Sequence, residues 1–166
     1  MREILCFGAV SWVLISGVSH AGDVPDVKTG LWSTTTNPGD PSVPRQTVTM
    51  CTSTALLQTV YDQHLKDPKQ PCKQTSVTHN GATTTEKNEC KFGDAVTKST
   101  VVTVASADTA VHTEIHQDGK STVVVSESKY VGACPAGMQL GDFVGPDGKK
   151  SNVLHPGNDR TPAKTP

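Results

Sequence analysis

Apolar and polar residues alternate along much of the chain, with the period of two that is typical of half-buried β-strands. The alternation predicts strands separated by turn-forming residues, at 30–35, 43–51, 97–105, 109–116 and 121–131. A hairpin is predicted from Cys72 to Phe92, because Asn80-Gly81 can supply the positive φ angles of a tight turn. The arms of this hairpin bring the expected total to about six or seven strands.

One segment has helical periodicity. Thr52 or Ser53 can cap it, and Asp67-Pro68 ends it. Between these limits apolar residues recur at near-helical spacing, at Leu56, Leu57, Val60, Tyr61 and Leu65. The sequence therefore predicts a mainly β fold, in which one α-helix packs on a curved antiparallel sheet.

The last two predicted strands have faces of opposite character. A three-residue loop at 117–119 would place Val111 opposite Val125 and give the hairpin a valine-rich face. The opposite face would carry His112, Glu114 and His116. We expect the valine face to lie toward the helix and the histidine face to be solvated.

Composition indicates a β-rich chain with a small core. After residue 21 the chain contains 17 Val and 22 Thr but only six Leu and one Ile. Val and Thr are stiff at χ1 and suit a pleated surface, whereas a helical protein of this size would use more Leu and Ala. Cross-links are therefore expected to contribute a large part of the stability.

The first 21 residues have the organisation of a secretory signal peptide. Arg2 precedes an apolar run from Ile4 to Val18, and Ser19-His20-Ala21 closes the run with small residues where a signal peptidase reads them. The 15 residues of the run fall short of the ~20 that cross a bilayer, so an uncleaved anchor is the less favoured alternative. Cys6 stands at the start of the run, which argues against a lipoprotein. We expect a processed chain that begins at Gly22 and resides in the periplasm, or is secreted.

Four cysteines remain after processing, namely Cys51, Cys72, Cys90 and Cys134. An even number in an exported chain indicates two disulfides, and the spacing matches no zinc-binding pattern. Three pairings are open to four cysteines. The predicted hairpin brings Cys72 within one or two residues of Cys90, so the favoured bridges are Cys72–Cys90 and Cys51–Cys134.

Charge and the C-terminal composition limit the remaining functions. With 15 basic and 16 acidic residues the chain has no basic field of the kind that binds nucleic acid. Residues 135–166 contain five Pro and five Gly and lack periodicity. They are predicted to form a flexible tail after a β-rich domain at 22–134.

Candidate metal ligands gather at His112, Glu114 and His116, which share one side of a strand. At about 3.3 Å per residue the two histidines lie roughly 13 Å apart, too far to share one zinc ion without a bend. The chain has no nucleophile elbow, His-Glu-x-x-His motif or dinucleotide glycine motif. We therefore assign no catalytic residue and no cofactor, and a metal-binding or metal-dependent enzymatic role remains an alternative.

Trp32 is expected to anchor the core under the helix. In a second interpretation it lines an apolar ligand groove between helix and sheet, together with Leu56, Leu57, Val60 and Tyr61. The leading functional hypothesis is a non-enzymatic periplasmic binding or envelope-associated protein, with a small apolar ligand or an envelope protein as partner. A structural protein-interaction module is the alternative.

Ordered landmarks along the chain resemble those of an exported bacterial family. They are Gly30-Leu31-Trp32, Met50-Cys51, Cys72-Lys73, Cys90 and Ser128-Lys129-Tyr130-Val131-Gly132-Ala133-Cys134. Together they resemble the family known as domain of unknown function 3617 over about residues 28–135. The chain departs from it at Ser33, where the family tends to carry a charged residue, and in its long C-terminal extension. The resemblance implies a small periplasmic β-rich protein and supplies no catalytic residues, because the family has no established activity.

Overall fold

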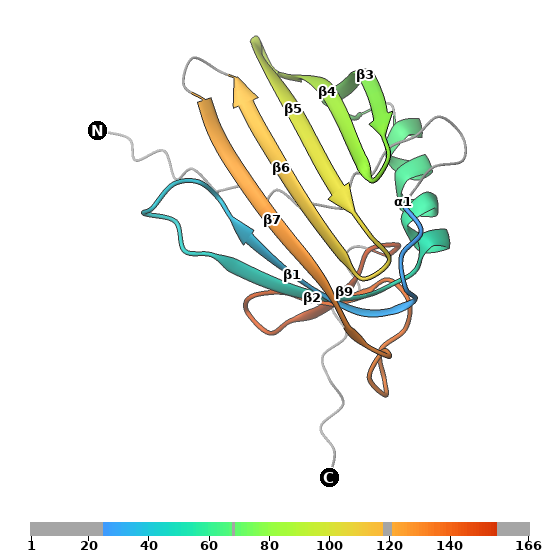
Figure 1. The fold of residues 1–166 in the computed structure, drawn as a ribbon. Helices are drawn as coiled ribbons and strands as arrows, with labels where there is room; N and C mark the ends of the chain where they lie inside the picture. Colours follow the sequence, from blue (N-terminus) through green and yellow to red (C-terminus); the bar gives the residue numbers. More distant parts are fainter. Residues whose placement is uncertain (1–24, 68, 118–120, 156–166) are drawn as a thin grey trace.

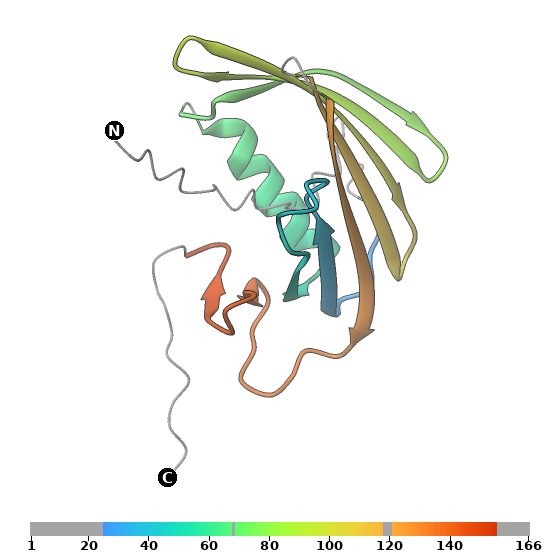
Figure 2. The ribbon, with the colours of Figure 1, turned by 90° about the vertical axis from the view of Figure 1, so that its left-hand side faces the viewer.

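The computed structural model describes residues 25–67, 69–117 and 121–155. The predicted signal peptide at 1–21 and the chain after residue 155 lie outside these ranges. Within them, an antiparallel sheet curves over one helix (Figures 1 and 2). No helix among the described residues has the length and apolar character needed to span a bilayer. The predicted mainly β fold with one helix and two disulfides is confirmed.

The helix α1 runs over Thr54–Lys66. The strands are β1 Gly30–Asn37, β2 Gln46–Thr52, β3 Cys72–Asn80, β4 Thr83–Phe92, β5 Ala95–Ala105, β6 Thr109–Gln117, β7 Ser121–Gly132, β8 Asp142–Val144 and β9 Lys150–Asn152. Their order across the sheet is β3-β4-β5-β6-β7-β1-β2-β8-β9. All predicted strands are present, and β8 and β9 are additional. β2 begins three residues later than expected, after Pro44, which has no N–H to donate to a ladder.

A β-bulge brings the cysteines of the first hairpin into register. The turn lies at Gly81 and Ala82, where Gly81 has a φ of 59°. The pairing shifts between Gln74 and Ser76, so Thr75 is an extra residue on β3. Cys72 consequently stands opposite Cys90, and the two form a disulfide. Cys51 and Cys134 form the second, so both favoured pairings are present.

The helix begins as the sequence predicts. The Ser53 side chain accepts a hydrogen bond from the Leu56 N–H at 3.2 Å, which identifies Ser53 as the N-cap. Leu56 and Leu57 of the first turn are buried.

The apolar core is small and occupies one end of the sheet. It comprises Val27, Trp32 and Leu57, with Met50 and Tyr130 packed against them. Trp32 meets Tyr130 edge to face, at 6.0 Å between ring centroids.

Gly30 allows β1 to approach the end of β7 in this region. Gly30 has a φ of 149°, and a Cβ there would lie 2.3 Å from the Gly132 carbonyl oxygen. Only glycine fits this position, which gives a physical reason for the residue that precedes Leu31-Trp32.

The predicted register of the last long hairpin is wrong by two residues. Val111 pairs with Glu127 rather than with Val125, and Gln117 pairs with Ser121. The loop therefore starts one residue later than expected, which moves the pairing by two positions. Because the side-chain period of a strand is also two, each residue stays on its expected face.

The orientation of these faces is the reverse of the expectation. Trp32 of β1 packs against Leu57 of the helix, so its face of the sheet is the one turned toward the helix; we call it the inner face. Register places His112 and Ser126 on the same face, where they are 5% and 1% exposed. The predicted solvated face is therefore turned toward the helix, with His112 buried and Glu114 and His116 partly buried. Valines expected to face the helix lie on the opposite, outer face, where Val111 is 40% exposed.

The first part of the predicted flexible tail is folded. β8 pairs with β2, and β9 pairs with β8, so residues 142–152 extend the sheet. Asp142 is buried and binds the Lys150 ammonium at 2.8 Å, the Asn152 amide at 2.8 Å and the Gln139 N–H at 2.8 Å. Two three-residue strands show no readable periodicity, which is why the sequence pattern missed them.

Asp142 is predicted to make this extension sensitive to acid. Burial acts to raise the pKa of its carboxyl, but hydrogen bonds from Asn152, Gln139 and Lys150 outweigh burial and hold the pKa at about 2. The stability from this group is therefore present above pH 3.8 and lost as the pH falls through 2. Asp142→Asn should lower the free energy of unfolding at pH 7 by about 1–2 kcal/mol. Urea unfolding measures this value.

Asp147→Asn is the matched control, because Asp147 forms an exposed ion pair with Lys149 in the same segment. It should leave the unfolding free energy nearly unchanged. Equal effects of the two substitutions would show that the Asp142 cluster does not hold the extension.

Candidate functional site

A row of polar side chains crosses six strands of the inner face. In spatial order its members are His79, Thr84, Thr103, His112, Ser126 and Thr36, and each stands opposite the next. We call this set the polar row. Alternate positions on paired strands lie on the same face, so the register alone aligns these side chains.

Hydrogen bonds pair the members of the polar row. His79 Nδ1 lies 3.1 Å from Thr84 Oγ1, and Thr103 Oγ1 lies 3.0 Å from His112 Nδ1. The hydroxyls of Thr36 and Ser126 are 2.9 Å apart. Polar groups removed from water are costly unless they are paired, and these pairs offset that cost.

Two acidic residues lie beside the polar row. Glu86 of β4 and Glu114 of β6 both stand opposite Val101 of the intervening β5, on the inner face. Glu114 lies 3.5 Å from His116 Nε2. Glu86 Oε2 accepts a hydrogen bond from the Gln74 amide at 3.1 Å.

Glu86 is the least satisfied of these groups. The residue is 3% exposed, and its Oε1 atom is buried without a hydrogen-bond partner. Burial raises the pKa of the Glu86 carboxyl to about 7; the bond from Gln74 acts in the opposite direction, and the charge of Glu114 raises the pKa further. The Glu86 carboxyl consequently titrates near neutral pH.

The predicted metal ligands share the inner face but have other contacts. His112 Nδ1 lies next to Thr103, and burial lowers the pKa of the imidazole, an effect that Glu114 opposes. His112 is therefore neutral at pH 7. Among the described residues no group of three or more His, Cys, Asp or Glu is arranged to hold a metal ion.

The residues predicted to line a groove divide into two groups. Trp32, Leu56 and Leu57 are buried, and Trp32 and Leu57 belong to the packed core. Val60 and Tyr61, further along the helix, are partly buried. The core role expected for Trp32 is thus the one that the structure displays.

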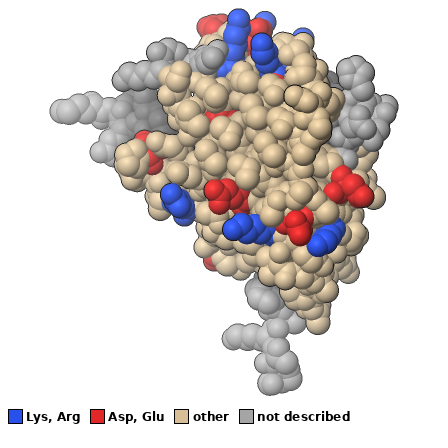
Figure 3. Space-filling model, viewed as in Figure 1, with Lys and Arg blue, Asp and Glu red and all other residues tan. Residues whose placement is uncertain are grey.

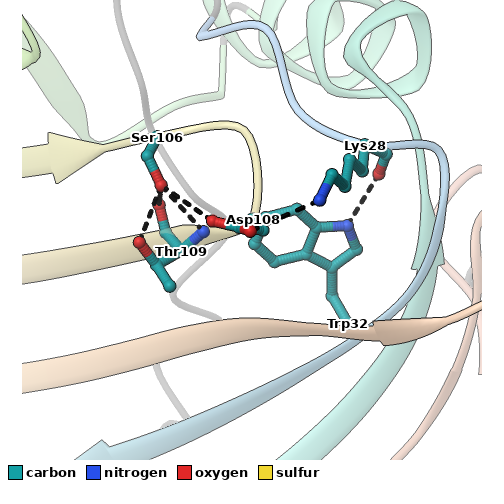
Figure 4. A network of polar contacts seen from close by, with 5 residues as sticks. All are labelled: Lys28, Trp32, Ser106, Asp108 and Thr109. Carbon is teal, nitrogen blue, oxygen red and sulfur yellow. Dashed lines mark hydrogen bonds and ion pairs between the residues drawn. The ribbon is translucent and has the colours of Figure 1, made fainter.

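A network at one end of the sheet anchors the segment that precedes β1 (Figure 4). The Trp32 indole donates to the Lys28 carbonyl oxygen at 2.8 Å, and the Lys28 ammonium lies 3.3 Å from Asp108 in the β5–β6 turn. Ser106 bonds both Asp108 and Thr109 in the same turn. These contacts join the core to the turn and close this end of the inner face.

The outer face is weakly polar and uncovered by the helix. Val104, Val111 and Val123 are 47%, 40% and 42% exposed. Figure 3 shows few charged side chains across the middle of this face, with most of them near its upper and lower rims.

Sequence patterns did not single out Glu86 or Thr103. Both occupy alternating positions of predicted strands, and only the register between strands places them beside His112 and Glu114. Polar residues at most of the alternate positions of β4 to β7 were the available signal, interrupted at Val101, Ala110 and Val124.

The fold and the inner face define a small disulfide-bonded β domain with a buried polar sheet surface. A family model described as "Protein of unknown function (DUF3617)" matches residues 27–134. The chain belongs to this family. No curated protein and no solved structure matches it.

Glu86 is predicted to destabilise the folded chain above neutral pH. Its pKa in the folded state, about 7, exceeds its ordinary value of 4.5, so the free energy of unfolding should fall as the pH rises from 4.5 through 7. Glu86→Gln removes this ionisation. The variant should therefore gain about 2–3 kcal/mol relative to wild type between pH 5 and pH 8.

Urea unfolding at both pH values provides the measurement. Glu89→Gln, on the outer face of the same strand, removes an equal charge and is the control; it should not reproduce the gain of Glu86→Gln. If the difference in unfolding free energy between Glu86→Gln and wild type stayed constant from pH 5 to pH 8, the raised pKa of Glu86 would be contradicted.

Proposed function

We propose that the chain is an exported periplasmic protein that binds a small polar ligand on its inner face without converting it chemically. The observation that supports this proposal is the set of buried polar side chains on the inner face, namely Thr84, Glu86, Thr103, His112 and Ser126. The apparent signal peptide and the two disulfides support an oxidising compartment outside the cytoplasm.

The distribution of polarity favours binding over a purely structural sheet. An antiparallel sheet covered on one side usually turns its apolar side chains toward the cover. Here the covered face carries Thr103, His112 and Ser126, and the more exposed face carries valines. Polar groups on the concave, helix-facing side of the sheet (Figure 2) can fix the orientation of a bound ligand.

The polarity also changes the expected ligand. An apolar molecule would leave Glu86 Oε1 without a hydrogen-bond partner. We therefore replace the apolar ligand of the initial hypothesis with one that donates hydrogen bonds.

The protein purified from a periplasmic extract is expected to retain a ligand. Native mass spectrometry should show the mass of residues 22–166 with two disulfides plus an adduct that disappears on denaturation. Thr103→Val should reduce the adduct several-fold, because it removes a hydroxyl that is 1% exposed on the inner face and leaves His112 Nδ1 without that partner.

Thr113→Val is the matched control on the outer face of β6 and should retain the adduct. Circular dichroism establishes that both variants are folded. A wild-type protein that remains ligand-free after incubation with periplasmic extract would overturn the binding proposal.

A second candidate function, a protein-interaction module, is favoured by the exposed valines of the outer face. In that case Val111→Lys should at least halve cross-linking to periplasmic proteins in intact cells, because a charge would be buried at the interface. Thr103→Val should leave cross-linking unchanged. Cross-linking that Val111→Lys does not reduce would remove the outer face from consideration.

A further inference from the structure

Building on the proposed function, we propose that the ligand carries a protonated amino group, which binds between the Glu86 and Glu114 carboxylates on the inner face. The site lies where β4, β5 and β6 run side by side in the upper part of the sheet (Figure 1).

Register brings the two carboxylates to one place. Glu86 and Glu114 flank Val101, a buried residue without polar side-chain atoms. The Val101 side chain therefore offers no hydrogen-bond donor to the Glu86 or Glu114 carboxyl. Both side chains start from the same face, on strands separated only by β5, and the charge of Glu114 acts on the Glu86 carboxyl.

Glu86 supplies an independent indication of a missing partner. It is 97% removed from solvent, given its 3% exposure, yet Oε1 has no hydrogen-bond partner. Gln74 satisfies only Oε2. A buried acceptor without a donor costs free energy, and a ligand donor at Oε1 would recover it.

Charge decides which donor suits the site. Neither carboxylate forms an ion pair with a Lys or Arg among the described residues; the sole basic group paired with Glu114 there is His116, at 3.5 Å. Two carboxylates that have no Lys or Arg partner attract a positively charged ligand group more strongly than a neutral hydroxyl.

An ammonium group fits this donor set better than a metal ion. Calcium takes six to eight oxygen ligands and zinc takes four ligands, whereas the described residues hold no cluster of three or more acidic, His or Cys side chains arranged for a metal. An ammonium carries three N–H donors and needs no fixed coordination geometry. One donor can reach Glu86 Oε1 and another can reach Glu114.

Calorimetric titration of the processed chain at pH 8 tests the inference, with putrescine as the probe and 1,4-butanediol as its uncharged counterpart. Putrescine should bind and butanediol should not. Glu86→Gln and Glu114→Gln should each weaken putrescine binding by at least about tenfold, because each removes one charge partner. Glu89→Gln, on the outer face of β4, should bind like wild type.

The unfolding free energy of each variant, measured by urea, distinguishes lost binding from lost folding; Glu86→Gln is expected to be folded and at least as stable as wild type at pH 8. Equal putrescine affinity in all variants, binding of butanediol, or binding of calcium ions in place of putrescine would overturn the inference. An amine-free adduct in the native mass spectrum would also overturn it, while leaving the proposed function in place.

Discussion

The linkage of Cys51 to Cys134 beside the Trp32 core is the constraint on which the rest of the structure depends. Few residues contribute to the apolar core, and they occupy one end of the sheet. The disulfide closes a sequence separation of 83 residues at β2 and the segment after β7. In the chain-entropy model a bridge of that span stabilises by about 4.6 kcal/mol, and the Cys72–Cys90 bridge adds about 3 kcal/mol. Natural domains commonly have free energies of unfolding of only about 5–15 kcal/mol, so the two disulfides contribute a large part of the stability.

This covalent stabilisation permits a sheet face that would otherwise be costly. Thr84, Thr103, His112 and Ser126 of the polar row are buried, and each forms a hydrogen bond with another member of the row. Glu86 departs from this pattern because Oε1 has no partner. Groups that remain unsatisfied in a native structure often mark functional sites, and here the group lies on the concave, covered side of the sheet.

Several elements could be predicted because their signals are local. Ser53 and the apolar spacing after it defined the helix, and Asn80-Gly81 defined a hairpin whose only positive φ is at Gly81. The disulfide pairing followed from that hairpin, although the bulge at Thr75 that completes the register left no readable signal. β8 and β9 were missed because three-residue strands carry no period. Their attachment depends on Asp142 and Lys150, which meet only after folding.

The sequence by itself determined the β-rich class and the helix and favoured the Cys72–Cys90 pairing, because turns, caps and alternation act between residues close together in the chain. It also determined which residues share a face, since the alternation of a strand is a property of the backbone. Only the tertiary structure decided which face is covered. Trp32 packs under the helix, which defines the covered face at β1. The register between neighbouring strands then places Glu86, Thr103 and His112 on the same face. Contacts between residues far apart in the chain set this orientation, so no local pattern records it.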